Sequence, residues 1–170
     1  MTESPLELVS QSPAVTVAIG EALAGFLRNG DVVLLHGDLG AGKTTLAKGI
    51  ASALGIEDVV SSPSFSLVNE YDASLAAAVT RLYHLDLYRL RGEDDLASIG
   101  FDDFMAPTNG VTLLEWPERA AAALPKHFLL IEIETVGSGS RHLRFVPGPD
   151  NGTWTCRLEG LRSLLASTAD

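Results

Sequence analysis

A chain of 170 residues with 46% hydrophobic content can bury one sizeable core, so we expect a single globular domain. Twelve basic residues against twenty-two acidic ones give a net charge of −10, and the basic residues form no patch, which argues against direct binding to a nucleic-acid backbone. The N-terminus lacks the features of a signal peptide, and no apolar run approaches the ~20 residues that span a bilayer. We therefore expect a cytoplasmic protein without membrane contact, in which the single cysteine, Cys156, is a buried apolar side chain.

The first half of the chain alternates helix and strand signals. Apolar residues spaced by three and four predict an amphipathic helix over 13–27, with Ser12 as its cap. The apolar run over 32–36, bounded by turn residues, is typical of a strand buried on both faces of a parallel sheet. A second helix is predicted over 42–54 and ends at Gly55.

The second half continues this alternation with shorter elements. Predicted extended segments cover 67–71, 81–86, 111–116 and 128–136, a short helix covers 93–99, and after the turn cluster 147–152 a strand over 154–158 precedes a helix over 161–166. This order predicts an α/β fold with a mostly parallel sheet flanked by helices. We expect one domain over 1–170, with its motifs in a core at about 16–146 and a C-terminal extension over 147–170.

A phosphate-binding motif lies between the first predicted strand and the second predicted helix. The motif G-x-x-x-x-G-K-[ST] is matched by Gly37, Asp38, Leu39, Gly40, Ala41, Gly42, Lys43 and Thr44. Glycines allow the backbone to aim its N–H groups at phosphate oxygens, and the helix N-terminus adds positive potential. The lysine is suited to the β and γ phosphates and the threonine hydroxyl to Mg²⁺, so the motif predicts binding of a nucleoside triphosphate with magnesium.

Side chains at strand ends supply the candidate metal ligands. His36, Asp86 and Glu115 lie near the C-terminal ends of predicted strands, where ligands bind in α/β sheets. Asp86 and Glu115 are the candidates for holding the metal or orienting an attacking water. His84 has no second histidine at ligand spacing, so we expect a packed or hydrogen-bonded residue there. No Asn-Lys-x-Asp run for guanine recognition is present, which favours ATP over GTP.

Further motifs give the chain a family resemblance. The phosphate loop continues into Thr45, and the blocks that follow it are Ser62-Pro63-Ser64-Phe65, Asn69-Glu70-Tyr71, His84-Leu85-Asp86-Leu87-Tyr88-Arg89-Leu90, Glu93 to Ile99 with Gly100, and Glu115-Trp116-Pro117. In this order and at these distances the sequence resembles the bacterial TsaE (YjeE) family, small ATPases required for making threonylcarbamoyladenosine in tRNA. The resemblance covers about Thr16 to Arg144.

The resemblance implies a three-layer P-loop NTPase fold and slow ATP hydrolysis that is stimulated by a heterodimer of TsaB and TsaD. In that picture tRNA is reached only indirectly, through the complex. By carry-over Lys43, Asp86 and Glu115 are the catalytic residues, and Thr44, Asp86 and Glu115 hold Mg²⁺. The nucleotide is expected to contact the run from Gly37 to Thr45, Trp116 beside it, Ser64 in a switch segment whose family counterpart is commonly threonine, and the region around Ser12.

Two other readings of the same motifs remain open. A small-molecule kinase would need an arginine-bearing lid, for which the Arg89-Leu90-Arg91 region is the candidate, and it would transfer phosphate to a metabolite rather than to water. A non-enzymatic nucleotide-sensing adaptor would need Lys43 but would tolerate Glu115→Gln.

Overall fold

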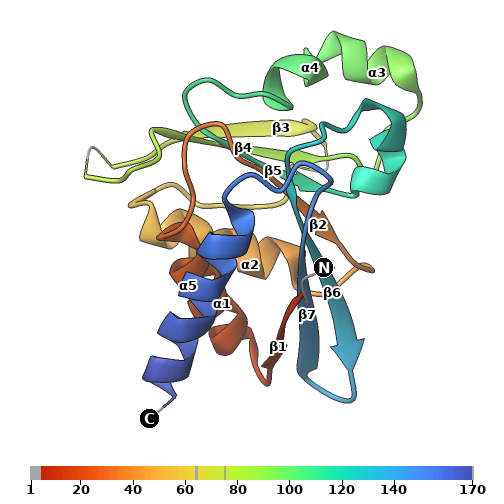
Figure 1. Cartoon of the computed structure of the whole chain (residues 1–170). Helices are drawn as coiled ribbons and strands as arrows, with labels where there is room; N and C mark the ends of the chain where they lie inside the picture. The colour runs from red at the N-terminus through yellow and green to blue at the C-terminus, as the bar shows by residue number, and fades with distance from the viewer. Residues whose placement is uncertain (1–4, 64, 75, 170) are drawn as a thin grey trace.

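The computed structural model describes residues 5–63, 65–74 and 76–169, which fold around one seven-stranded sheet (Figure 1). The strands are β1 (Leu6–Ser10), β2 (Val32–His36), β3 (Val68–Asp72), β4 (Arg81–Asp86), β5 (Val111–Glu115), β6 (Leu129–Val136) and β7 (Ser140–Pro147). The helices are α1 (Pro13–Ala24), α2 (Lys43–Ala53), α3 (Glu93–Ser98), α4 (Phe101–Phe104), the 3-10 helix η1 (Pro117–Ala123) and α5 (Trp154–Thr168). None of the helices among the described residues is long and apolar enough to cross a membrane.

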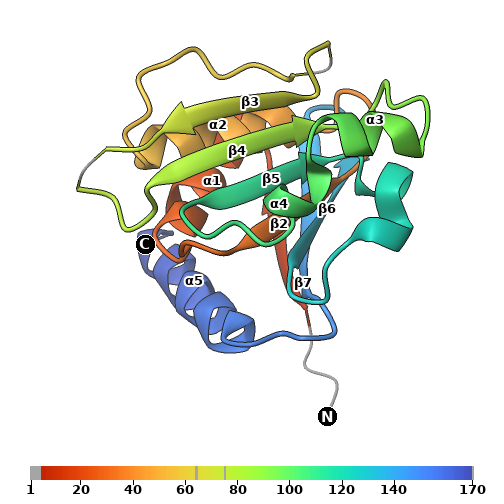
Figure 2. The ribbon, with the colours of Figure 1, turned by 90° about the horizontal axis from the view of Figure 1, so that it is seen from above.

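The sheet is mixed rather than mostly parallel, which corrects the expectation from the sequence. Its strand order is β1-β7-β6-β2-β5-β4-β3, and the view from above shows β3, β4, β5 and β2 side by side (Figure 2). The central pairings of β2 with β5, β2 with β6 and β4 with β5 are parallel. The outer pairings of β1 with β7, β6 with β7 and β3 with β4 are antiparallel. For the last two pairs the reason is the short connection between the strands, which is compatible only with antiparallel pairing.

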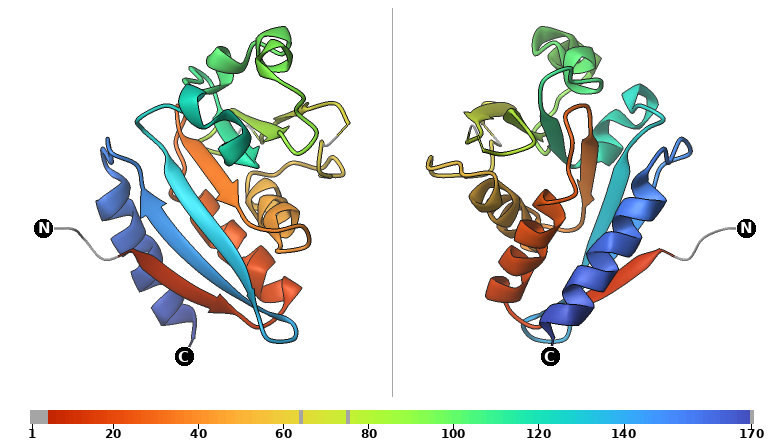
Figure 3. Two further views of the ribbon diagram at one scale, coloured as in Figure 1. Left: turned by 90° about the vertical axis from the view of Figure 1, so that its right-hand side faces the viewer. Right: turned by 60° about the vertical axis from the view of Figure 1, so that its left-hand side comes forward.

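Helices cover both faces of the central strands, as expected for an α/β fold (Figure 1). Val33 and Leu35 of β2 join the core beneath α1, α2 and α5, whereas Val32 and Leu34 join a second core with α4 and η1. This double burial explains the nearly continuous apolar run of β2. The strands β1, β7 and β6 differ, since α1 and α5 lie behind them on one face only (Figure 3).

Two glycines let α1 and α2 approach closely, and this approach fixes the start of α2. A Cβ atom at Gly20 would overlap the carbonyl oxygen of Leu46, and one at Gly49 would overlap that of Val17. Backbone of one helix therefore lies directly against the other. Because α2 begins at Lys43, the packing of the two helices also positions the loop that precedes it.

The C-terminal extension contains one helix, α5, and the predicted strand over 154–158 is wrong. In α5, Trp154, Leu158 and Leu161 are buried against the core at helical spacing, so tertiary packing decides its conformation. Arg157 makes two hydrogen bonds to Asp31 at the start of β2, at 2.6 and 2.9 Å, and both side chains are buried. Cys156 is exposed on this helix, contrary to the expectation of burial.

Candidate functional site

The loop from β2 to α2 folds as the glycine pattern requires. The amide of Ala41 donates to the carbonyl of Asp38 at 3.1 Å, closing a tight turn whose third residue, Gly40, has a φ of 76°. That value is typical of the third position of a type II turn, where side chains are disfavoured. Gly42 precedes α2 with a φ of 111°, a second conformation that L side chains rarely adopt.

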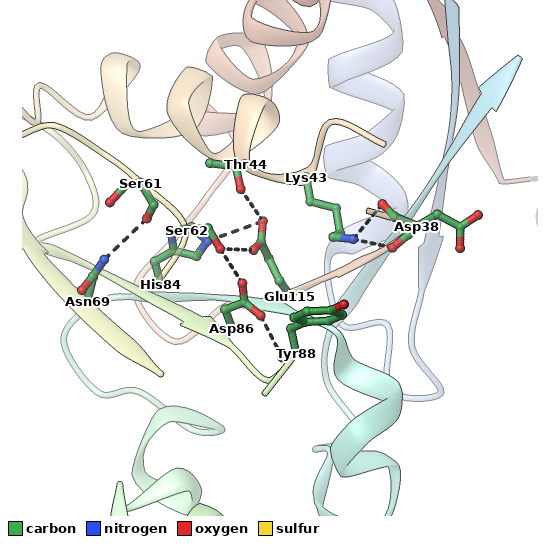
Figure 4. A network of polar contacts seen from close by, with 11 residues as sticks. Asp38, Lys43, Thr44, Ser61, Ser62, Asn69, His84, Asp86, Tyr88 and Glu115 are labelled. Atoms are coloured by element: carbon green, nitrogen blue, oxygen red, sulfur yellow. Dashed lines mark hydrogen bonds and ion pairs between the residues drawn. The ribbon is translucent and has the colours of Figure 1, made fainter. Parts of the chain in front are cut away.

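Lys43 is directed along this loop. Its ammonium group donates to the carbonyls of Gly37 and, at 3.0 Å, Asp38 (Figure 4). It also lies 4.0 Å from the ring centre of Trp116. The side chain is largely buried. Burial lowers the pKa of Lys43, although the nearby charge of Glu115 acts in the opposite direction.

The two candidate carboxylates are brought together by the parallel pairing of β4 with β5. Asp86 and Glu115 are direct neighbours in the register, and both are buried, with 3% and 2% of their surface exposed. The hydroxyl of Ser62 bridges them, since it bonds Asp86 and lies 3.2 Å from Glu115 (Figure 4). Thr44 donates to Glu115 at 3.0 Å, which ties the start of α2 to the carboxylate pair.

Both carboxyl groups are buried, but their different neighbours give them different proton affinities. Burial raises the pKa of Asp86, and the charge of Glu115 raises it further, against the hydrogen bonds from Ser62 and the Tyr88 amide. Burial also acts to raise the pKa of Glu115, but His84, Asp86 and Thr44 together hold it below its usual value. Glu115 is therefore the more readily ionised member, and a cation between the two groups would relieve their repulsion.

His84 lies beneath this pair. It is fully buried on β4, and its Nε2 is 3.8 Å from Oε1 of Glu115. Within the described part of the chain neither ring nitrogen has a hydrogen-bond partner. The structure thus places His84 as a packed residue beside the carboxylates.

Aromatic and basic side chains form the outer wall of the cleft. Trp116 follows β5 with a φ of 59°, and this turn sets its ring 5.0 Å from that of Tyr88. Arg89 stacks on Phe65 at 4.0 Å. The cleft has a volume of about 430 Å3, and its lining consists of Leu39, Gly40, Ala41, Gly42, Lys43, Thr44, Thr45, Ser62, Asp86, Tyr88, Arg89, Glu115 and Trp116.

Several residues predicted for the site lie outside this lining. Gly37, Asp38 and His36 face a neighbouring hollow, and His36 is 3.9 Å from Glu118. Ser12 caps α1, where its hydroxyl accepts from the amide of Val15 at 3.2 Å. Ser64 lies outside the described residues.

Sequence reasoning also missed two residues that contact the residues lining the cleft. Ser62 contacts both carboxylates, whereas the residue predicted from the sequence is Ser64, two positions later. Its presence in the same short block was the available signal. Arg141 of β7 contacts the phosphate loop and had no local signal, because about a hundred residues separate the two.

The donor set suits magnesium better than a softer metal. Thr44, Asp86 and Glu115 offer hard oxygen atoms, and no group of three or more histidine, cysteine or acidic side chains arranged for a metal occurs in 5–63, 65–74 and 76–169. Magnesium commonly takes one or two carboxylates and completes its shell with water and substrate phosphates. The three residues therefore fit a Mg²⁺ ion that is shared with a phosphorylated ligand.

Comparison with known proteins points to one family. The family model "Threonylcarbamoyl adenosine biosynthesis protein TsaE" matches residues 10–143. A protein of that name from Bacillus subtilis is 41% identical over 134 residues, which cover 79% of this chain and 80% of the relative. Another from Treponema pallidum is 37% identical over 138 residues, covering 81% of this chain and 98% of the relative.

A solved structure agrees with the sequence comparisons. The crystal structure of YdiB from Bacillus subtilis superposes with a TM-score of 0.70 at 34% identity, over 98% of this chain and 97% of that one. Family model, relatives and structure thus agree over the segments that build the cleft. The chain belongs to the TsaE family.

Proposed function

We propose that this protein is a Mg²⁺-dependent ATPase with a P-loop NTPase fold, which supports threonylcarbamoyladenosine synthesis on tRNA together with TsaB and TsaD. The observation that carries the proposal is the convergence of three features on one cleft. These are the glycine-built loop, the lysine at the start of α2, and a hydroxyl bonded to one of two paired buried carboxylates. Such a set matches the needs of a magnesium-bound polyphosphate.

The phosphates are held by the loop and by Lys43. The amide groups at the start of α2 supply fixed donors and the positive end of a helix. Lys43, which now bonds the carbonyls of Gly37 and Asp38, exchanges these neutral acceptors for phosphate oxygens when the nucleotide enters. Binding an anion favours its charged form, so the pKa that burial lowers rises again in the complex.

The metal is held by Thr44, Asp86 and Glu115. Bound Mg²⁺ supplies positive charge to the β and γ phosphates and so stabilises the charge that develops during hydrolysis. Glu115 stays ionised because its pKa is depressed, which suits a carboxylate that binds the metal or orients the attacking water. A cation beside Asp86 would offset both the burial of this carboxyl group and the charge of Glu115, which raise its pKa, and so would favour its ionised form.

The family role decides what the ATP cycle serves. The relatives are named for threonylcarbamoyladenosine biosynthesis, and this chain shares their whole motif-bearing segment. Its net charge of −10 disfavours direct tRNA binding, so contact with tRNA runs through the partners. ATP is the expected nucleotide because no guanine-reading Asn-Lys-x-Asp run is present.

Reconstitution of the modification reaction tests this proposal. Purified TsaB, TsaD and the remaining components are combined with tRNA and ATP, and modified nucleoside is measured with wild-type chain, Lys43→Ala, or the control Lys48→Ala. Lys48 is exposed on the same helix, so it reports on an equivalent charge loss outside the cleft. We expect multiple turnover with wild type and Lys48→Ala only. An equal yield of modified nucleoside without this chain would refute the proposal. Transfer of the labelled γ-phosphate to a metabolite, rather than its release as inorganic phosphate, would refute it as well.

A further inference from the structure

One arginine outside the motifs holds the phosphate loop from behind. Arg141, near the start of β7, donates through Nε to the carbonyl of Ala41 at 2.9 Å and through Nη2 to the carbonyl of Gly40 at 3.2 Å. Its Nη1 donates to the carbonyl of Ser140 at 3.0 Å. All three guanidinium nitrogens therefore contact backbone carbonyls, two of them in the loop.

Arg141 makes these contacts without an acidic partner. In a chain with ten more acidic than basic residues, its guanidinium forms no ion pair within the described ranges, whereas Arg144 on the same strand pairs with Glu132 at 2.9 Å. A half-buried arginine with its full charge directed at peptide carbonyls makes charge-assisted hydrogen bonds, which are stronger than neutral ones. The arrangement favours one orientation of the peptides it contacts.

That orientation matters because a trans peptide holds its C=O and N–H in opposite directions. The Ala41 carbonyl points at Arg141, so the N–H of Gly42, a residue that lines the cleft, points away from Arg141. The Gly40 carbonyl points the same way, and the N–H of Ala41 then closes the turn to Asp38. Because residues 40 and 42 are glycines, whose backbone adopts many conformations, these peptides can rotate unless other contacts hold them.

Two cationic side chains donate to the carbonyls of the loop, and ligand binding draws one of these side chains away. Lys43 holds the carbonyls of Gly37 and Asp38, and Arg141 holds those of Gly40 and Ala41. In the proposed function Lys43 moves to the phosphates, which leaves its two carbonyls without that donor. Arg141 does not need to move.

We propose that Arg141 is a positioning residue that preorganises the phosphate loop for the β-phosphate, an inference that rests on the proposed nucleotide binding. It acts through the two peptides it contacts and not by touching the ligand. A lysine cannot replace it, because one ammonium group lacks the rigid fork that reaches two successive carbonyls.

Calorimetric titration of Mg-ADP and Mg-ATP tests the inference with Arg141→Ala, Arg141→Lys and the control Arg162→Ala. Arg162 is exposed on α5, so its loss changes net charge equally. Because each charged hydrogen bond corresponds to a factor of about ten to a hundred, we expect at least about tenfold weaker binding for both Arg141 variants and wild-type affinity for Arg162→Ala. Methylguanidinium at millimolar concentration is expected to restore part of the affinity of Arg141→Ala alone.

The outcomes separate this inference from the function beneath it. Failure of the wild-type chain to bind either nucleotide would refute nucleotide binding itself. Wild-type binding with Arg141→Ala within about threefold of it would overturn the positioning role alone. A loss of affinity that methylguanidinium does not restore, together with a lower melting temperature of both ligand-free Arg141 variants, would also overturn it, because Arg141 would then be a general stabilising residue.

Discussion

Replacing Asp86 by asparagine is expected to stabilise the ligand-free protein while removing its response to magnesium. Two acceptors that share the Ser62 hydroxyl lie within about 6 Å of each other, given ordinary hydrogen-bond lengths. Two full charges at that distance repel by about 3 kcal/mol at an effective dielectric constant of 20. Hydrogen bonds from Ser62 and from the Tyr88 amide at 2.8 Å offset part of this, so we expect a net gain of about 1–2 kcal/mol at pH 8.

The pH dependence of this gain in stability follows from the direction in which the pKa of Asp86 is shifted. Because burial and Glu115 raise the pKa of Asp86 in the folded state, its ionised form destabilises the fold. That penalty is fully present above the folded-state pKa, and it disappears as the pH falls below the unfolded value of about 3.9. The advantage of Asp86→Asn over wild type should therefore be largest above the folded-state pKa of Asp86 and should shrink toward acid pH.

Urea unfolding at several pH values, with and without Mg-ADP, measures both effects. Asparagine keeps an acceptor for the Tyr88 amide, and the Ser62 hydroxyl can donate to Glu115 while accepting from the new amide. The exposed Asp58→Asn serves as the control for the same chemical change. An Asp86→Asn protein that is less stable than wild type at pH 8, or that gains as much stability from Mg-ADP as wild type does, would refute the reasoning.

Three further predictions concern the site and its support. The ring centre of Trp116 lies 4.0 Å from the Lys43 ammonium, so Mg-ADP should change the tryptophan fluorescence of wild type but not that of Trp116→Phe. If Trp116→Phe shows the same fluorescence change as wild type, the change comes from Trp154 instead. Thr44→Val removes the hydroxyl bonded to Glu115 and should weaken Mg-ADP at least about tenfold while leaving metal-free ADP within about threefold, which a titration with and without EDTA checks. Arg157→Met removes the guanidinium partner of buried Asp31, which keeps the Arg28 amide as a donor at 2.8 Å, and should lower the free energy of unfolding by about 3 kcal/mol in urea; a loss under about 1 kcal/mol would contradict this.

The parts of the structure that follow local rules were predicted well. The apolar run of β2, the glycine loop and the start of α2 occupy consecutive residues, and each residue type has its own conformational reason. Asp86 and Glu115 were identified from their positions at strand ends, and the parallel pairing of β4 with β5 places them together.

The parts that the sequence did not predict depend on distant partners. β1 and β7 pair with each other across more than a hundred residues, and the polar residues of β7 obscure its alternation. These two strands make one edge of the sheet antiparallel, and the pairing of β3 with β4 makes the other edge antiparallel, so the sheet is mixed. α5 was split because Trp154 favours a strand locally, whereas burial of Leu158 and Leu161 favours a helix. Arg141 reaches the loop only because β7 lies beside it in the folded chain.

Titration of Mg-ATP into the wild-type chain, Lys43→Ala and Lys48→Ala tests the central claim most directly. Both lysines lie on α2, but only Lys43 lines the cleft. The account predicts saturable binding to wild type and Lys48→Ala and at least about a hundredfold loss in Lys43→Ala, since a phosphate-bound charge leaves the site. No binding to wild type, or equal binding to Lys43→Ala, would contradict it.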